Sequence, residues 1–82
     1  MRDEITIRES NDADAGALLR LAALDDRPAL RGPAMLAFVG GELAAARTLE
    51  GGTAVADPFR RTAHLLDMLA LQSETLRARG RA

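Results

Sequence analysis

The chain has 82 residues, with 12 acidic and 11 basic side chains and a formal net charge of -1 at pH 7. This length fits one domain, so we expect a single domain over residues 1–82 that buries only about 60 to 65% of the surface exposed on unfolding. The balanced charge, with arginines spread along the chain, argues against a nucleic-acid-binding surface.

Residue types that build metal and membrane sites are scarce. The chain contains no cysteine and one histidine, His64, which excludes a disulfide framework and a zinc site of the usual His/Cys type. The longest uncharged apolar run, residues 34–39, is too short to cross a bilayer, and the amino terminus lacks an apolar segment of signal-peptide length. We therefore expect a cytoplasmic protein with no metal site and no membrane contact.

The first third of the chain predicts a strand followed by a helix. Residues 5–8 alternate apolar and polar side chains, as a half-buried strand does. Asn11 is a favourable N-cap, and Asp12 and Asp14 bring negative charge to the first turn of a helix that is predicted to reach about Leu24. The apolar side chains of this helix fall on one stripe, formed by Ala15, Leu18, Leu21 and Ala22.

The middle of the chain predicts three antiparallel strands. Residues 34–39 and 42–49 are joined by Gly40 and Gly41, and a two-residue glycine connection is typical of a hairpin. A second glycine pair leads to a third strand over residues 53–56, so the three strands form a meander.

The pattern of these strands also predicts how the sheet is covered. Neither long strand alternates cleanly between apolar and polar side chains, which is typical of a sheet covered on both sides. One helix precedes the meander and a second follows it. We predict an α/β (α+β) fold in the order β-α-β-β-β-α, with a mainly antiparallel sheet that has helices on both faces.

The second predicted helix carries two apolar lines. The first is a stripe expected to pack on the sheet, formed by Leu65, Leu66, Leu69 and Leu76. The second lies more than about 100° away on the helix and is formed by His64, Met68, Leu71 and Thr75. In so small a domain a second apolar line is usually buried against another chain, so we predict a homodimer with these four residues at the interface. The alternative is that Met68 and Leu71 are scattered surface residues or touch the loop over residues 25–33.

Three segments resemble a known family. They read ITIRESNDADAGALLRL, VGGELAAA and VADPFRRTAHLLDMLALQSETLRARG. Together they resemble the first two thirds of the GNAT superfamily of N-acetyltransferases. The resemblance implies an N-terminal strand, one or two helices, three antiparallel strands and a long helix. It also implies a pyrophosphate loop for acetyl-CoA between the fourth strand and that helix.

The resemblance places the cofactor on particular residues. The family's Val-x-Pro-x-x-Arg lead-in is similar to the run from Val55 to Arg61, and the first residue of the loop falls on Arg60 or Arg61. The implied cofactor-binding residues are Val55, Arg60, Arg61, Ala63, His64 and Leu65, and the pantetheine arm would pair with residues 54–56. The two glycines of the loop fall on Ala63 and Leu65 in one register and on His64 and Leu66 in the other, so neither register supplies a glycine.

The segment ADPFRRTAH, residues 56–64, has two interpretations. If the helix begins at Asp57, the carboxylate caps the first amides, Pro58 occupies the first helical position, and a phosphate is repelled. If the helix begins near Thr62, residues 57–61 form a loop whose arginines could hold phosphates beside the free amides. The aspartate, the proline and the missing glycines favour the first interpretation.

The residues offer little for catalysis. The fifth strand and the tyrosine of a later helix, which the resemblance would imply, have no counterpart, and the chain contains no tyrosine. His64 has no serine, cysteine or paired carboxylate at a recognisable spacing, so the catalytic residues stay unknown. Asp25, Asp26 and Glu50 flank turns and are expected to be solvated.

We therefore expect a truncated GNAT-like domain that acts as a homodimeric binding or interaction module without acyl-transfer chemistry. The alternative is a minimal acyl-CoA-dependent N-acetyltransferase whose acetyl-CoA groove is completed across a dimer, with catalysis by proximity of thioester and amine.

Overall fold

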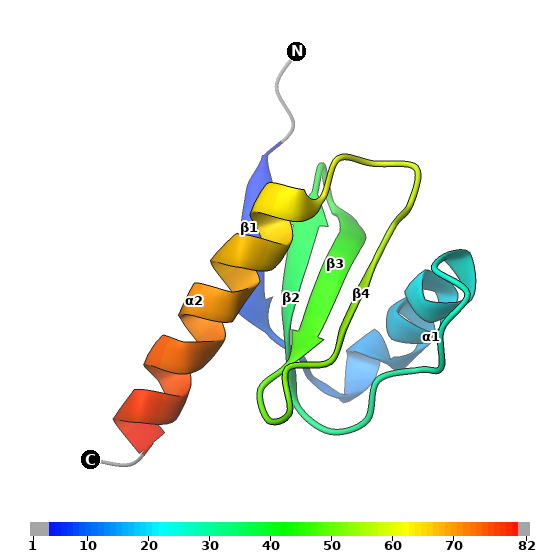
Figure 1. Ribbon diagram of the computed structural model, residues 1–82. Coiled ribbons are helices and arrows are strands. Elements are labelled where there is room, and N and C mark those ends of the chain that lie inside the picture. The colour runs from blue at the N-terminus through cyan, green and yellow to red at the C-terminus, as the bar shows by residue number, and fades with distance from the viewer. Residues whose placement is uncertain (1–3, 81–82) are drawn as a thin grey trace.

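The computed structural model describes residues 4–80 and contains a four-stranded antiparallel sheet and two helices (Figure 1). In chain order the elements are β1 (Ile5–Glu9), the short 3-10 helix η1 (Asp12–Asp14), α1 (Ala15–Leu24), β2 (Ala34–Val39), β3 (Glu42–Thr48), β4 (Ala54–Ala56) and α2 (Ala63–Gly80). The sheet has the strand order β1-β2-β3-β4, with every neighbouring pair antiparallel. The α+β class and the predicted order of elements are confirmed.

Strand β2 lies at the centre of the core. Its first four residues, Ala34 to Ala37, are between 0% and 7% exposed. Met35 and Ala37 belong to a cluster that contains Leu65 and Leu69 of α2. The residues that alternate with them, Ala34 and Leu36, belong to a second cluster that contains Leu21 of α1. Because successive side chains of a strand point to opposite faces, β2 contributes to both clusters.

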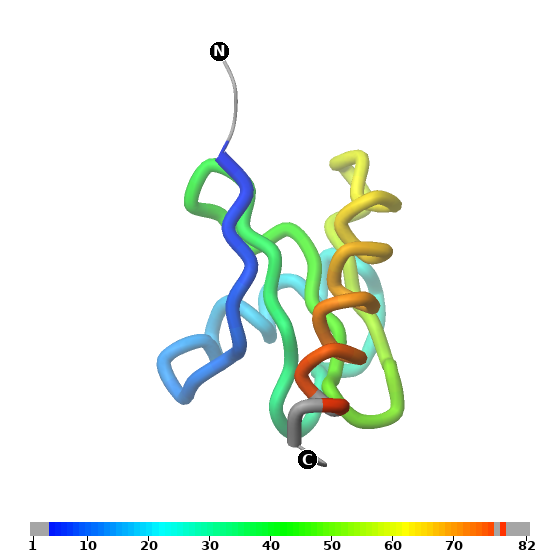
Figure 2. The backbone as a smooth tube through the Cα atoms, turned by 90° about the vertical axis from the view of Figure 1, so that its left-hand side faces the viewer, coloured from blue at the N-terminus to red at the C-terminus, as the bar shows by residue number. Residues whose placement is uncertain are grey.

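The two helices contact overlapping pairs of strands and share β3. Helix α2 lies along β2 and β3, whereas α1 lies along β3 and β4. Figure 2 views the sheet from the β1 side and shows α2 along one face of it. The predicted packing stripe of α2 is confirmed, since Leu65 and Leu69 are almost fully buried and Leu66 and Leu76 pack against them. In α1, Leu21 and Ala22 are buried, whereas Ala15 at the start of the predicted stripe is exposed.

A β-bulge explains why β3 does not alternate cleanly. The register between β2 and β3 shifts after Ala37, so that Ala37 lies opposite Ala45 and Phe38 opposite Leu43. The extra residue, Ala44, joins Ala45 in the cluster under α2. A bulge inserts one residue into a strand and lets two neighbours approach the same face. The run of small alanines in β3 is therefore buried by this irregularity as well as by the helices.

The predicted hairpin between β2 and β3 is confirmed. Gly40 and Gly41 have φ angles of 59° and 87°, the left-handed region that glycine adopts without steric cost. Two residues with positive φ form the type of turn that matches the twist of antiparallel strands. The glycine pair therefore fixes the register of the central hairpin.

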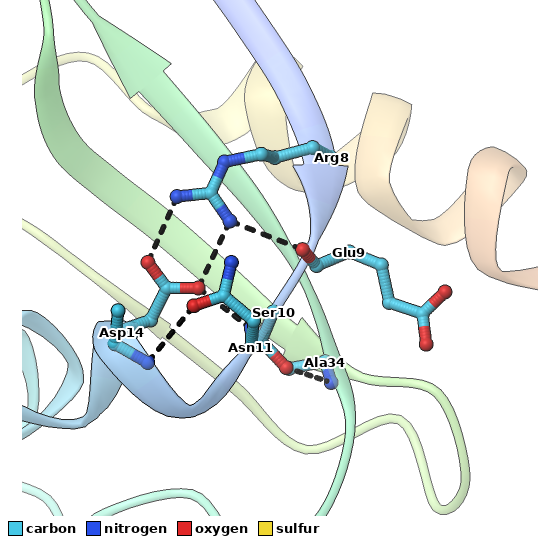
Figure 3. Close-up of polar contacts among 7 residues, drawn as sticks. Arg8, Glu9, Ser10, Asn11, Asp14 and Ala34 are labelled. Carbon is cyan, nitrogen blue, oxygen red and sulfur yellow. Dashed lines mark hydrogen bonds and ion pairs between the residues drawn. The ribbon is translucent and has the colours of Figure 1, made fainter.

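An ion pair ties β1 to the start of α1 (Figure 3). The guanidinium of Arg8 donates to both carboxylate oxygens of Asp14, at 2.9 and 2.8 Å, and lies 4.8 Å from the centre of the Phe38 ring. Asp14 also accepts the main-chain N–H of Asn11 at 2.7 Å, and the Asn11 side chain accepts the N–H of Ala13. Asn11 is thus the predicted N-cap, and it caps η1, which leads directly into α1.

These bonds stabilise the ionised form of Asp14. The hydrogen bond from Arg8, followed by that from Asn11, lowers the pKa of Asp14 from 3.8 to about 2, although burial acts in the opposite direction. Since the pKa is lower in the folded than in the unfolded chain, the ionised carboxylate contributes stability that is complete above pH 3.8.

We predict that Asp14→Asn lowers the free energy of unfolding at neutral pH and that its difference from the wild type shrinks as the pH falls from 3.8 to about 2. Urea denaturation followed by circular dichroism at several pH values measures this difference. Asp12→Asn, at an exposed neighbouring position, is the matched control. A difference between wild type and Asp14→Asn that is constant down to the lower pH would contradict the assignment.

Candidate functional site

The segment between β4 and α2 is a closed turn. Asp57 still belongs to the sheet ladder, because its N–H donates to the Ala44 carbonyl at 2.8 Å. Its side chain accepts the N–H of Phe59 at 2.8 Å, and its carbonyl accepts the N–H of Arg60 at 3.2 Å. Asp57 therefore organises its own turn rather than capping α2, a competition that is common for aspartate.

The prediction that the helix begins at Asp57 is wrong. Helix α2 begins at Ala63, and the first helical bond across this boundary runs from the N–H of Leu66 to the carbonyl of Thr62 at 2.9 Å. The physical reason is that Asp57 keeps its main-chain bond to β3, so the chain must leave the sheet before it can coil. The alternative start near Thr62 describes the structure.

The two arginines of this turn differ in their surroundings. The Arg60 guanidinium pairs with the carboxylate of Glu42 in the β2–β3 hairpin and lies 3.4 Å from that of Asp57. Arg61 is exposed and makes no ion pair or hydrogen bond with any other residue in the range 4–80. Of the two candidate phosphate ligands, only Arg61 is thus uncommitted within the described part of the chain.

The first turn of α2 offers main-chain donors. The first amides of a helix have no partner within the helix, and here they belong to Ala63, His64 and Leu65. No acidic residue lies in this turn, so the positive end of the helix dipole is not neutralised there. Ala63 and His64 are exposed, but the side chain of Leu65 is 1% exposed and lies in the core.

The outer edge of β4 is the other part of the implied cofactor site. The N–H of Asp57, just after the strand, points to Ala44 of β3. Because main-chain groups alternate in direction along an antiparallel strand, Val55 also faces β3. Ala54 and Ala56 therefore turn their N–H and carbonyl groups to the outer edge. Val55 itself is buried, with its side chain in the cluster that contains Leu21.

A carboxylate of the chain occupies this edge. Asp25, the residue that ends α1, accepts the N–H of Ala56 with Oδ2 at a distance of 3.1 Å. The same oxygen lies 3.2 Å from Nε of Arg27. The N–H groups of Asp25 and Arg27 bond to carbonyls of the last turn of α1, which holds the carboxylate in position. The expectation that Asp25 is a solvated turn charge is therefore wrong, whereas Asp26 and Glu50 are exposed as expected.

The outer line of α2 faces away from the sheet. Leu71 is 66% exposed and Met68 is 38% exposed, and His64 and Thr75 are exposed as well. The Thr75 hydroxyl donates to the Leu71 carbonyl at 3.0 Å, one turn back. The four residues thus form a continuous line on one side of the helix that no other part of residues 4–80 covers.

Other site types are not found in the described part of the chain. No group of three or more histidine, aspartate or glutamate side chains in residues 4–80 could hold a metal ion. None of the helices within that range is long and apolar enough to span a membrane. Comparisons with protein-family models, with curated proteins and with solved structures find no match to the chain.

The role of Asp25 at the β4 edge gives a direct prediction. Asp25→Ala should leave the Ala56 N–H without its protein acceptor, so its hydrogen exchange should accelerate relative to that of Val55, whose N–H faces β3. The loss of one hydrogen bond should lower the free energy of unfolding by about 1 kcal/mol. Amide exchange followed by NMR measures both effects, with Asp67→Ala on the exposed side of α2 as the control. Unchanged exchange at Ala56 would refute the contact.

Proposed function

We propose that this chain is a GNAT-like domain that acts as a homodimeric interaction module and does not carry out acyl transfer. One observation carries the proposal: two of the groups that a GNAT-like domain would offer to acetyl-CoA, at the β4 edge and in the loop before α2, are engaged by the chain's own carboxylates. Asp25 accepts a hydrogen bond from the outward-facing N–H of Ala56, and the carboxylates of Asp57 and Glu42 form ion pairs with the guanidinium of Arg60.

The edge of β4 would have to give up a hydrogen bond before it could pair with a pantetheine arm. A ligand amide could accept the N–H of Ala56 only if the Asp25 carboxylate moved away. Asp25 is half-buried and paired with Arg27, so its removal would also break an ion pair. The gain from one new hydrogen bond, about 1 kcal/mol, would be offset by the one that is lost.

The loop before α2 is also unsuited to a pyrophosphate. Glycine at such positions lets the main chain approach phosphate oxygens closely. In the register that starts at Arg60, the second glycine position is Leu65, whose side chain is buried beneath α2. In the register that starts at Arg61, the glycine positions are the exposed His64 and the partly buried Leu66. Both registers therefore place a side chain larger than that of alanine where the family has glycine or alanine.

We infer that the two helices cover opposite faces of the sheet, as in the GNAT arrangement. The alternation of β2 side chains between the Leu21 cluster and the Leu65 cluster supports this layering. With the packing stripe of α2 committed to one face, its outer line is left for a partner. Met68 and Leu71, three residues apart on the helix, supply adjacent apolar contacts for a second copy.

A second candidate function is an acyl-CoA-dependent N-acetyltransferase, and Arg61 favours it. This arginine is exposed and without an ion pair in residues 4–80, and it stands two residues before the free amides of α2. A guanidinium and helix amides together can hold a phosphate. This alternative requires that the β4 edge and the Asp57 turn rearrange when the cofactor binds.

Thermal unfolding with acetyl-CoA separates the two functions. We predict that the melting temperature is unchanged at millimolar acetyl-CoA, because the Ala56 N–H and the Arg60 guanidinium are already engaged within the chain. Binding would raise the melting temperature progressively with ligand concentration. A rise that is present in the wild type and lost in Arg61→Ala would show that acetyl-CoA binds beside Arg61, which would overturn the proposal and favour the acyltransferase alternative.

The homodimer gives a separate prediction. The double substitution Met68→Glu and Leu71→Glu should abolish association through the outer line of α2 and lower the association state of the chain, because each change would bury a charge at that interface without a partner. Analytical ultracentrifugation over a dilution series measures the association. Leu19→Glu is a matched control, since Leu19 is 60% exposed on α1 and outside the proposed interface. A wild-type chain that is monomeric at every concentration would rule out the dimer.

A further inference from the structure

Phe59 is the most exposed large apolar side chain of the described residues, at 83% exposure, although the main chain on both sides of it is fixed. Its N–H is held by the Asp57 side chain, and the next N–H, of Arg60, by the Asp57 carbonyl. Pro58 restricts the chain immediately before it. The ion pair of Arg60 with Glu42 anchors the other end of the turn to the β2–β3 hairpin. The ring is thus presented to solvent on a pre-organised turn.

A hollow of about 390 Å³ lies beside this turn, between α1 and the end of the β2–β3 hairpin. Its apolar lining comes from Leu21, Leu24, Phe38 and Leu43. Asp57 and Arg60, which flank Phe59 in the chain, line its rim, but Phe59 is not part of the lining. An apolar cavity of about 150 Å³ is sufficient for benzene, so the hollow has room for a phenyl ring.

We propose that Phe59 of one copy inserts into this hollow of a second copy, and that the second copy returns the same contact across a two-fold axis. The ring and the hollow are adjacent on one surface, so a single rotation can bring both rings to both hollows. Only such an isologous contact uses every ring and every hollow in a closed pair.

The charges around the hollow suit an aromatic occupant. Arg20 lines it and makes no ion pair with another residue in the described range, so its guanidinium is available to lie over the face of an inserted ring. Glu42 and Asp57 are already paired with Arg60 and would not be buried as lone charges. Because the turn is fixed before contact, little conformational freedom is lost on association.

This contact is independent of the outer line of α2. It uses the turn before α2, the outer end of α1 and the hairpin, whereas the proposed homodimer uses Met68 and Leu71 on the helix itself. The two contacts can therefore be tested separately. If both form, two distinct two-fold contacts would assemble dimers into tetramers or longer chains.

Disulfide trapping tests the pairing, because the chain contains no cysteine of its own. A mixture of the Phe59→Cys and Leu24→Cys variants, oxidised with diamide, should form a mixed disulfide between the two copies. Leu24 is 47% exposed and lines the hollow, so the substitution should not disturb folding. A mixture of Phe59→Cys with Ala29→Cys, an exposed position that does not line the hollow, is the control. Mass spectrometry counts the mixed species.

A mixed disulfide several-fold above the control supports the contact, and equal yields in the two mixtures overturn it. A second measurement uses the Met68→Glu, Leu71→Glu background, in which the α2 contact is removed. There Phe59→Ala and Leu24→Arg should each weaken the remaining self-association at least about tenfold. If that background does not self-associate even at high concentration, the Phe59 contact is wrong whatever the state of the α2 dimer.

Discussion

The double-sided burial of β2 is the constraint on which the rest of the structure depends. Ala34 to Ala37 are all at most 7% exposed, so each face of this strand must have a cover. Leu65 and Leu69 of α2 belong to one of the two clusters that β2 joins, and Leu21 of α1 belongs to the other. The inner sides of both helices are thereby committed. Surfaces that these contacts leave uncovered include the outer edge of β4, the exposed turn around Phe59 and the outer line of α2.

Aspartate carboxylates determine which main-chain donors near these surfaces are free to bind a partner or ligand. The ion pair of Asp14 with Arg8 joins β1 to the start of α1. Asp25 accepts the outward-facing N–H of Ala56, and Asp57 accepts the N–H of Phe59 in the turn that leads to α2. Each carboxylate satisfies a main-chain donor near the end of an element, where the sheet or helix leaves one unpaired. The proposed function rests on the contact of Asp25 with Ala56 and on the ion pair of Asp57 with Arg60, because a GNAT-like domain would meet acetyl-CoA at these positions.

Local sequence patterns predicted most of the fold, whereas contacts between segments far apart in the chain could not be predicted from the sequence. The glycine pair at Gly40 and Gly41 and the leucine spacing of α2 are local signals, and both elements lie as predicted. The bond from Ala56 to Asp25 joins residues 31 positions apart, and no spacing rule connects them. The favoured start of α2 at Asp57 is wrong for the same reason, since the bond of Asp57 to Ala44 outweighs the local helix-start signal, whereas the alternative start near Thr62 agrees with the structure. The outer line of α2 is exposed, and the prediction that a second copy buries it stays a proposal.

Residue-resolved NMR of the uniformly ¹⁵N-labelled chain, titrated with acetyl-CoA, tests the central claim most directly. If the contacts of Asp25 with Ala56 and of Asp57 and Glu42 with Arg60 keep acetyl-CoA from binding, the amide signals of Ala54, Ala56 and residues 63–65 should keep their positions at a large excess of ligand. Saturable shifts that are confined to these amides would mean that Asp25 and the Asp57 turn give way to the cofactor, and the non-catalytic account would then be wrong.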